Sequence, residues 1–494
     1  MRLVPRPEAP ALPEVPRPVR GDGPPRPLRP DHRRRTPPQR PAPLQLPRLR
    51  PPDPDDQRLL RHRLRETRRR GEVVLPARAA RQAPLEIRRG LDPQAGISRR
   101  PRGVRHRGGE RVQRVLAAGE TPGKDHALKI ALVVYTWSET LGGVERYVFD
   151  LARGLVARGH EVHVWCRRRD GGCPGVTFHE VPGTASGHTR HTAFARDTAR
   201  LVPVADYDVV HGFGRTFAQD LLRVGGGCHE EYLRRTRGRP PGPLWLLFHP
   251  KDRAQIRLEH EVFRRRCWRR LVCISRRVAE EVHRIHGIPL AECRVIHNGT
   301  DVGKFHPRHR TPGTGPVRIL FVGSGFERKG LEQAIDALAL VRGDWRFRVV
   351  GKGSARRYAA RAARLGIGDR VEFAGPQGDM PRQYGDADLV LFPTLYDAFG
   401  TVTLEGMATG LPVIVSRQAG SSEAVVHGTD GLIVEDPRDA AELSAAIRSL
   451  VDDPARREAI GAAARLAAER FSIDANIEQV LTVYADIARE KSRG

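Results

Sequence analysis

Two adjacent cations, Arg328 and Lys329, stand near the end of the segment Gly-Ser-Gly-Phe-Glu-Arg-Lys-Gly at residues 323–330. The segment follows a short apolar run that predicts a buried strand, and its end opens a predicted helix. A helix dipole disfavours cations at its start, so an anion bound between the two side chains would offset that cost. Because Arg offers a planar fork and Lys a point charge, a diphosphate is the ligand that fits. The alternative is that both are solvated surface groups.

Two carboxylates, Asp397 and Glu405, lie eight positions apart, with Phe399, Gly400 and Thr401 between them. The pattern predicts Asp397 in the loop after a strand and Glu405 a turn or more inside the next helix. Acceptor carboxylates on either side of an exposed helix start suit a neutral polyol beside a phosphate. Glycosidases also use paired carboxylates, but the two adjacent cations favour a phosphorylated ligand. A solvated acidic loop is the alternative.

A pair of glycines, Gly142 and Gly143, separates another apolar run from a helical pattern. Glycine lets the backbone approach a phosphate closely, and a helix start offers free N–H groups. A tight turn without a ligand explains the pair equally well. Three further candidates for substrate contact are expected at cleft-facing loop positions: His211, Arg215 and His229. Arg215 would meet an anionic acceptor, whereas a lone His is more often structural.

These candidates are positioned by a regular alternation of predicted strands and helices. In the first half, strands are expected at 129–135, 160–165, 208–211 and 271–274, with helices at 144–158 and 275–286. In the second half, strands are expected at 317–322, 347–350, 371–373, 388–392 and 412–415, with helices at 328–341, within 437–470 and at 473–490. This alternation predicts parallel, doubly wound α/β sheets. A Pro- and Gly-rich linker separates two Rossmann-like domains, at 127–312 and 316–494, whose ligands would sit beyond the carboxyl ends of the strands.

Residues 1–126 form a basic extension that is expected to be disordered. Residues 1–125 contain 31 Lys and Arg and 14 Asp and Glu, which is +17 of the chain's net charge of +27, and 23 of its 40 prolines. Such a segment cannot bury enough apolar surface to offset chain entropy. All 30 basic residues before Lys124 are arginine, which favours translated GC-rich DNA upstream of the natural start. A basic arm for nucleic acid or an acidic membrane is the alternative.

The composition argues against metal sites, disulfides and membrane spans. The six cysteines form no Cys-x-x-Cys pair and no histidine pair has zinc spacing, so free thiols in a reducing cytosol are expected. Asp386 and Asp388 mimic a metal-binding motif, but their place between a helix and a buried strand predicts a helix-end turn. Neither an apolar leader nor a run of about 18 apolar residues occurs. No metal is therefore implied.

In combination, the motifs resemble the family 4 retaining glycosyltransferases, which have the two-domain architecture called GT-B. The resemblance spans about residues 128–490. It rests on Gly-Gly-Val-Glu-Arg at 142–146, His-Asn-Gly-Thr-Asp at 297–301, Arg-Lys-Gly at 328–330 and the acidic motif at 397–405. Each piece alone is common, and the ordered combination is specific.

The resemblance implies a role for each part of the site. Arg328 and Lys329 would neutralise the donor diphosphate, and Glu405 would bind the nucleotide ribose. Asp397 and the amides at 399–401 would hold the donor sugar. Where the family usually has Glu-x7-Glu, the first acid here is Asp397, which is one methylene shorter. The resemblance also implies catalysis without a metal or other cofactor, with the nucleotide sugar as the co-substrate.

A narrower resemblance is to lipopolysaccharide core glucosyltransferases, and it rests on segments 142–146, 323–330 and 225–232. It implies transfer of a hexose, glucose from UDP-glucose, to a lipopolysaccharide core or related glycan. The enzyme would be cytoplasmic and peripheral at the inner face of the cytoplasmic membrane. Exopolysaccharide or lipid acceptors and mannosyl transfer stay open. Tyr147 stands where an acid is often found, so no acceptor-side role is carried over there.

An apolar stretch at 243–248 precedes a basic helical stretch at 253–270. Together they fit docking on anionic lipid, and a solvated helix face fits them equally well.

Two other functional classes share some of these features. A dinucleotide-binding oxidoreductase should show Gly-x-Gly-x-x-Gly after its first strand, with an acid about 20 residues on, and residues 135–143 lack that pattern. A nucleic-acid-binding protein would explain the basic extension, with an affinity that falls steeply as salt rises. Affinity for nucleic acid that is retained by the isolated extension would favour this second class. A glycosyltransferase is favoured over it, and for that function no nucleic-acid partner is expected.

Overall fold

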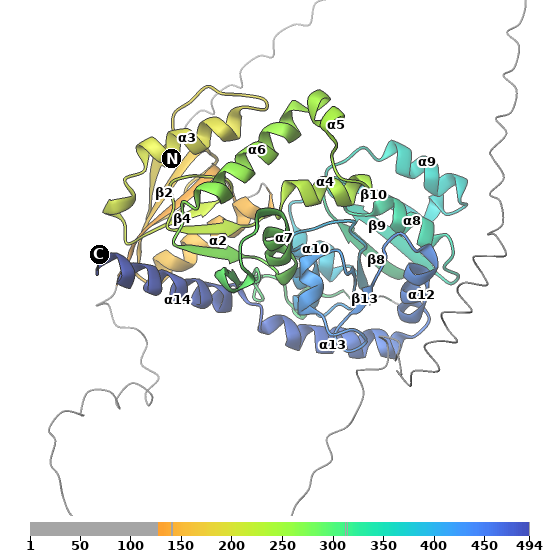
Figure 1. The fold of residues 1–494 in the computed structure, drawn as a ribbon. Coiled ribbons are helices and arrows are strands. Elements are labelled where there is room, and N and C mark those ends of the chain that lie inside the picture. The colour runs from red at the N-terminus through yellow and green to blue at the C-terminus, as the bar shows by residue number, and fades with distance from the viewer. Residues whose placement is uncertain (1–126, 140–141, 312, 314, 494) are drawn as a thin grey trace, which may run out of the picture. The chain divides into compact units, whose positions relative to one another are not determined.

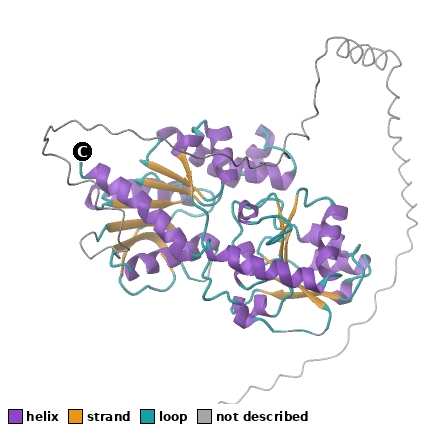
Figure 2. Cartoon of the chain, turned by 90° about the horizontal axis from the view of Figure 1, so that it is seen from below, coloured by secondary structure: helices purple, strands orange, loops and turns teal. Residues whose placement is uncertain are grey.

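The computed structural model describes residues 127–139, 142–311, 313 and 315–493. The predicted extension at 1–126 lies outside the described residues. The described part of the chain contains two sheets, and helices flank the strands of each (Figures 1 and 2). No helix within this part is both long and apolar enough to cross a membrane.

The first sheet has seven strands in the order β3-β2-β1-β4-β5-β6-β7, and every neighbouring pair is parallel. The strands are β1 (Lys129–Trp137), β2 (Glu161–Arg169), β3 (Val176–Glu180), β4 (Val209–Phe213), β5 (Leu221–Val224), β6 (Arg270–Cys273) and β7 (Cys293–Val295). The helices are α2 (Gly143–Ala157), α3 (Arg190–Leu201), α4 (His229–Arg237), α5 (Pro243–Phe248), α6 (Pro250–Arg265) and α7 (Arg276–His286).

The second sheet has six parallel strands in the order β10-β9-β8-β11-β12-β13. The strands are β8 (Val317–Val322), β9 (Trp345–Val350), β10 (Val371–Gly375), β11 (Leu389–Phe392), β12 (Val413–Ser416) and β13 (Leu432–Val434). The helices are α8 (Leu331–Leu338), α9 (Arg356–Arg364), α10 (Met380–Gly385), α11 (Val402–Ala408), α12 (Ala440–Val451), α13 (Pro454–Glu469) and α14 (Ile473–Lys491). The prediction of two doubly wound parallel sheets is confirmed.

The apolar run of β1 is continuous because both faces of the strand are covered. Ile130 and Leu132 pack in one hydrophobic cluster with α2 and α14, whereas Ala131 and Val133 pack in another with Phe194 of α3. Successive side chains of a strand point to opposite faces, so a strand buried on both sides shows no polar alternation. The continuous apolar run therefore predicted a buried parallel strand correctly.

α14 packs against the first domain, although the linear division of the chain at 312–316 assigns it to the second. Its residues Ile477, Val480 and Tyr484 are buried in the cluster that contains β1 and α2. The hydroxyl of Tyr147 on α2 also donates to Oδ1 of Asn476 at 2.8 Å. Figure 1 shows α14 beside the first sheet and α13 with the second. The apolar stripe of α14 therefore belongs to the core of the first domain.

The sequence of strands in the second sheet sets the place of the candidate site. β8 lies between β9 and β11, so the chain order reverses there. The loop after β8 (residues 323–330, the β8 loop) and the loop after β11 (residues 393–401, the β11 loop) therefore leave neighbouring strands at the same edge. Open α/β sheets bind their ligands at such a reversal.

Four strands of the structure were not predicted, and each has five residues or fewer. They are β3, β5, β7 and β13. The predicted helix at 328–341 is shorter in the structure, because α8 begins at Leu331. Its N-cap is Gly330, which has a φ of +79°. A left-handed residue cannot continue a helix backward, so the two cations before it lie in a turn.

Candidate active site

Arg328, Lys329 and Asp397 form one cluster at the edge of the second sheet. Nη1 of Arg328 and Nζ of Lys329 both donate to Oδ2 of Asp397, at 2.7 and 2.5 Å. Nη1 of Arg328 also donates to the carbonyl oxygen of Tyr396 at 3.0 Å. The Lys329 ammonium lies 4.6 Å from the centre of the Phe392 ring. The structure thus brings together the three residues with predicted catalytic roles, which we call the charged cluster.

Backbone contacts fix the two loops that carry the charged cluster. The carbonyl oxygen of Arg328 accepts hydrogen bonds from the Leu395 amide and the Thr394 hydroxyl, each at 2.9 Å. A Cβ at Gly330 would lie 1.9 Å from the carbonyl oxygen of Pro393. Only glycine permits this approach, and its positive φ suits glycine as well. The Arg-Lys-Gly sequence therefore supplies both the charges and the close packing that holds them in place.

Burial and mutual attraction set the charges of the cluster. Burial alone would raise the pKa of Asp397, but Lys329 and Arg328 outweigh it and lower that pKa to about 2. Burial lowers the pKa of Lys329, helped by Arg328, and the attraction of Asp397 offsets only part of this. With all three groups charged, two cations face one carboxylate. The surplus positive charge is what a diphosphate would meet.

The expectation that the dipole of a helix acts directly on Arg328 and Lys329 is wrong. The two cations lie in the turn before α8 and not in its first turn, so the helix dipole opposes them less than expected. Asp397, a residue of the chain itself, already meets both of them. Capacity for a ligand remains at Arg328, whose side chain is 30% exposed and whose bonds within the described residues use Nη1 alone.

The segment from Asp397 to Thr401 presents backbone groups to the site. The Phe399 ring is buried, and the Phe399 amide donates to Oδ1 of Asp397 at 3.3 Å. Gly400 has a φ of +88°, and a Cβ there would lie 2.5 Å from the Phe392 ring. Thr401 is the N-cap of α11. Backbone amides at such a turn can hold the hydroxyl groups of a sugar.

Glu405 is the fourth residue of α11, close to its predicted place inside that helix. Its Oε2 accepts a hydrogen bond from the Tyr384 hydroxyl at 2.5 Å. Burial raises the pKa of Glu405, while Tyr384, Lys304 and Arg146 act to lower it. Arg146 lies on α2, so the first domain reaches this carboxylate electrostatically. A half-buried carboxylate of this kind can accept hydrogen bonds from the hydroxyl groups of a ribose.

Gly142 and Gly143 form the start of α2. Gly142 is the N-cap, both glycines are exposed, and no side chain of the described residues caps this end of the helix. Uncapped N–H groups of a 15-residue helix favour an anion. Arg146 in the next turn acts on Glu405, which indicates that this helix start faces the second domain's site.

The structure places His211 in the core and not at a cleft-facing position. β4 runs on to Phe213, two residues beyond the predicted strand, so His211 is a strand residue. Only 1% of it is exposed, and its Nδ1 lies 2.6 Å from the Tyr484 hydroxyl of α14. Burial lowers its pKa well below the ordinary value. A neutral, buried ring has no access to a substrate.

Arg215 and His229 are likewise held within the first domain. Arg215 forms an ion pair with the buried carboxylate of Glu259. Nε2 of His229 lies 3.0 Å from Oδ1 of Asp252, and its backbone amide donates to Glu259. Both partners belong to α6, so an acceptor group would have to compete with these carboxylates. The sequence offered no sign of this pairing, because the partners are 23 to 44 positions away.

Two possible metal motifs have protein partners. Asp386 follows α10 as its C-cap and Asp388 pairs with Arg318 at 2.9 Å, in agreement with the predicted helix-end turn. In the described part of the chain, one group of three side chains lies close enough to share an ion: Cys228, Glu259 and His286. Its carboxylate already pairs with a guanidinium, which disfavours a cation there. Catalysis without metal stays a prediction.

Sequence reasoning missed three side chains that support the site, Tyr384, Tyr396 and Glu281. Tyr384 contacts Glu405, and Tyr396 directly precedes Asp397. Glu281 lies on α7 and accepts a hydrogen bond from the Tyr396 hydroxyl at 2.8 Å. Only the adjacency of Tyr396 to the acidic motif was visible in the sequence. The other two are brought in by folding.

Comparison with known proteins matches both halves of the chain to glycosyltransferase families. The model of the family described as Glycosyltransferase Family 4 matches residues 141–304, and that described as Glycosyl transferases group 1 matches residues 304–467. The glycogen synthase of Mycobacterium tuberculosis is 28% identical over 398 residues, which cover 72% of this chain and 92% of that protein. The lipopolysaccharide glucosyltransferase WaaG of Escherichia coli is 23% identical over 338 residues, covering 64% and 88%.

Solved structures share the fold. A crystal structure of WaaG superposes with a TM-score of 0.63 at 22% identity, covering 72% of this chain and 99% of that chain. The Anabaena protein Alr3699/HepE in complex with UDP-glucose superposes with a TM-score of 0.57 at 18% identity, covering 73% and 100%. With two adjoining family models, a two-sheet fold and the charged cluster at the sheet reversal, the chain belongs to the family 4 glycosyltransferases of the GT-B fold.

Proposed function

We propose that the protein is a retaining hexosyltransferase that moves glucose from UDP-glucose to a lipopolysaccharide core or a related glycan. The observation that carries the proposal is the surplus positive charge of the cluster at the sheet reversal. Two cations converge on Asp397 beside a helix that presents Glu405. WaaG is named a lipopolysaccharide glucosyltransferase, which supports the acceptor, and HepE forms a complex with UDP-glucose, which supports the donor.

In the proposed reaction, the bond between the anomeric carbon and the phosphate oxygen breaks as the acceptor hydroxyl forms a new bond to that carbon. Arg328 and Lys329 stabilise the charge that develops on the leaving diphosphate. The departing phosphate oxygen takes the acceptor's proton, as the family resemblance implies, so no separate protein base is required. Asp397 and the amides of the β11 loop orient the sugar, and Glu405 holds the ribose.

We propose that the acceptor is presented at the inner face of the cytoplasmic membrane. Three apolar side chains on the short helix α5 are strongly exposed: Leu244 at 75%, Leu247 at 58% and Phe248 at 76%. Basic side chains lie next to this helix: Arg237 is stacked over the Trp245 ring, 3.5 Å from its centre, and Arg253 is near the start of the following helix, α6. An apolar tip beside basic side chains favours the surface of anionic lipid, and a lipid-linked acceptor would lie there.

A soluble glucan is the second candidate acceptor. The glycogen synthase match has higher identity and wider coverage than the WaaG match. The two acceptors differ in charge and in attachment to lipid, so they predict different partners for the first domain.

A panel of nucleotide sugars tests the donor, with nucleotide release by the purified protein as the readout. UDP-glucose is expected to give the highest kcat/KM, and ¹H NMR of the product is expected to show the donor's anomeric configuration. Rough lipopolysaccharide and glycogen are then compared as acceptors. An inverted product would overturn retention, and release from a non-glucose donor alone would overturn the sugar assignment.

A further inference from the structure

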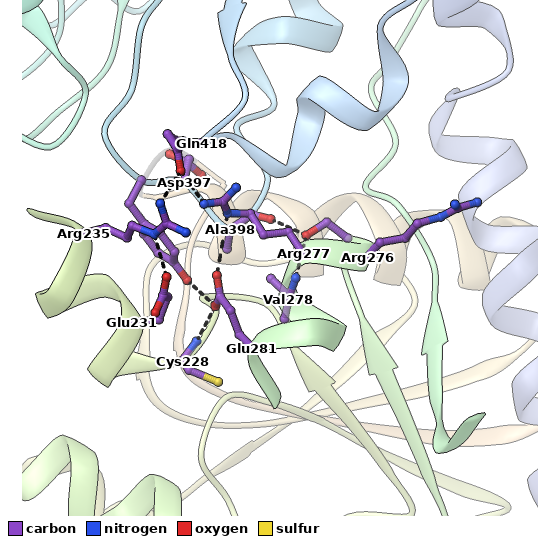
Figure 3. A network of polar contacts seen from close by, with 12 residues as sticks. Cys228, Glu231, Arg235, Arg276, Arg277, Val278, Glu281, Asp397, Ala398 and Gln418 are labelled. Atoms are coloured by element: carbon purple, nitrogen blue, oxygen red, sulfur yellow. Dashed lines mark hydrogen bonds and ion pairs between the residues drawn. The ribbon is translucent and has the colours of Figure 1, made fainter. Parts of the chain in front are cut away.

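Glu281 of α7 is a buried carboxylate that joins the first domain to the β11 loop. Its Oε2 accepts hydrogen bonds from the Tyr396 hydroxyl at 2.8 Å and from the Cys228 amide at 3.3 Å. Only 4% of Glu281 is exposed. Figure 3 shows it directed toward Cys228 and toward the segment that carries Asp397 and Ala398. One side chain of the first domain therefore contacts the segment that holds the charged cluster.

Tyr396 connects Glu281 with the charged cluster. Its carbonyl oxygen accepts hydrogen bonds from Nη1 of Arg328 at 3.0 Å and from the Thr394 hydroxyl at 3.1 Å. The next residue is Asp397, which pairs with both cations. Tyr396 is 2% exposed, and its hydroxyl donates to Glu281 alone among the described residues. Any displacement of Tyr396 would move the carboxylate on which the cations converge.

A glycine of the first domain leaves room for this contact. Gly227 has a φ of +69°, and a Cβ there would lie 1.9 Å from the Tyr396 hydroxyl oxygen and 3.2 Å from Oε2 of Glu281. Any other residue would displace the hydroxyl from the carboxylate. The last glycine of the Gly-Gly-Gly run at 225–227 thus has a steric reason that the sequence alone did not reveal.

Further contacts hold the β11 loop and the loop after β12 against α7. The Ser275 hydroxyl donates to the carbonyl oxygen of Ala398 at 3.0 Å. Nη2 of Arg277 donates to Oε1 of Gln418 at 2.6 Å, and Nη1 of Arg235 donates to the same oxygen at 2.9 Å. The start of α7 and the end of α4 thus support the segments that frame the site.

A carboxylate is a costly choice for a purely structural role at this position. Oε1 of Glu281 has no hydrogen-bond partner among the described residues, and the nearest cation, Nε of Arg277, lies 3.8 Å away. Burying a charged group that is only partly satisfied destabilises a fold. An amide or an apolar side chain would cost less. A role other than packing would account for a carboxyl group at this position.

We propose that Glu281 is a positioning residue for glycosyl transfer: by holding Tyr396 it fixes Asp397, and through Asp397 it sets the spacing of Arg328 and Lys329 around the donor diphosphate. This inference rests on the proposed function, because it assigns the charged cluster to the donor. Glu281 itself contacts no substrate.

The ionisation of Glu281 gives the inference a measurable signature. Burial raises its pKa to about 7, against the hydrogen bonds from Tyr396 and the Cys228 amide. The titratable and charged groups that act on it come from four places: α4 with its N-cap, α7, the end of β6 and the β11 loop. They are Cys228, Glu231, Arg234, Arg277, Cys273 and Tyr396. An ionised carboxylate accepts the stronger hydrogen bond, so turnover should rise with pH through this range.

The test compares Glu281→Gln, Tyr396→Phe and the double variant by kcat and KM for the donor between pH 5.5 and 8.5. Glu280→Gln is the control, since Glu280 is the exposed neighbour on the same helix. We expect each single variant to lose about tenfold in kcat/KM at pH 8. We also expect the double variant to lose no more than either single one. The acid limb near pH 7 should disappear in Glu281→Gln.

The outcomes separate this inference from the proposed function. If wild type and Glu280→Gln turn over a donor while Glu281→Gln matches them at every pH, the inference is overturned. Additive losses in the double variant would overturn it as well. If wild type releases nucleotide from no sugar donor, the proposed function fails and takes the inference with it. Tyr396→Phe keeps the buried ring, so it serves as the second probe should Glu281→Gln fold poorly, with thermal melting as the check.

Discussion

Nζ of Lys329 lies 2.5 Å from Oδ2 of Asp397, although the two residues are 68 positions apart in the chain. The contact joins the β8 loop to the β11 loop at the reversal of the second sheet. It makes one carboxylate the internal partner of two cations and leaves a surplus positive charge. This surplus positive charge favours the binding of a phosphorylated donor.

Lys329→Ala is expected to lower kcat by about 100- to 1,000-fold, as for the loss of one preorganised group that stabilises charge in a transition state. The fold should persist, because Asp397 keeps its ion pair with Arg328. Nucleotide release and far-UV circular dichroism check the two statements. Lys251→Ala on the surface of α6 is the control and should keep wild-type turnover. Near-normal turnover by Lys329→Ala would remove that residue from the mechanism.

Asp397→Asn is expected to separate binding from chemistry. Without the carboxylate, two cations face each other, so the free protein should lose about 2 kcal/mol of stability. UDP supplies negative charge at the same place and should still bind, while transfer of the sugar should fall by at least about 100-fold. Calorimetric titration with UDP and nucleotide release test the split. Loss of UDP affinity with an intact kcat would contradict it.

The pH dependence of stability provides a second measurement on Asp397. Its folded pKa of about 2 lies below the ordinary value, so the stabilisation it provides is present above about pH 4 and is lost as pH falls toward 2. Acid unfolding of wild type should therefore be steeper between pH 4 and 2 than that of Asp397→Asn. Identical slopes would mean that the cations do not stabilise the carboxylate.

Glu405→Gln and Tyr384→Phe are both expected to raise the donor KM with little change in kcat, by roughly three- to tenfold each. Tyr384 fixes Oε2 of Glu405, and the variant without the hydroxyl leaves that oxygen free to turn away from the ribose. The increase in KM should be smaller for a nucleotide-sugar donor whose ribose lacks the 2′-hydroxyl, because even the wild-type protein cannot make that contact with such a donor. Equal losses with both donors would contradict the ribose assignment.

Gly330→Ala and Gly366→Ala form a matched pair that isolates one close contact. Both glycines have positive φ, +79° and +76°. A Cβ at Gly330 would lie 1.9 Å from the Pro393 carbonyl oxygen, whereas no atom of the residues that the structure describes lies within 4 Å of one at Gly366. Backbone strain should cost both variants about 1 kcal/mol of stability. Gly330→Ala should lose more stability than Gly366→Ala and should also lose turnover, because its clash pushes the two loops apart. Equal activity of the two variants would show that the fit of the β8 loop against the β11 loop is unimportant.

Part of the candidate site could be predicted from the sequence. Arg328, Lys329 and Asp397 could be singled out because their types and spacing carry chemistry within one short segment each. The strand pattern then predicted parallel sheets, and the edge at which loops meet follows from sheet topology. That Asp397 is itself the anion between the cations could not be predicted, since it depends on a contact between loops 68 positions apart.

The side chains predicted to contact the substrate in the first domain, in contrast, have partners within the protein. His211 appeared to end a strand, but β4 continues through it and α14 covers it from the far end of the chain. Arg215 and Glu259 are 44 positions apart, and no spacing rule links them. Local patterns predict elements, whereas pairing between elements decides which polar side chains are free to meet a ligand.

The stability of the protein should also report on Glu281. Burial raises its folded pKa from 4.5 to about 7, so the folded state holds a proton that the unfolded state releases. The favourable contribution of this group is therefore complete below about pH 4.5 and is lost as pH rises through 7. Relative to Glu281→Gln, wild type should become less stable by about 2–3 kcal/mol between pH 5 and 8. Urea unfolding of both proteins at several pH values measures the difference, with Glu280→Gln as the control. A difference that does not change with pH would show that Glu281 is already ionised at pH 5 and that burial does not govern its charge.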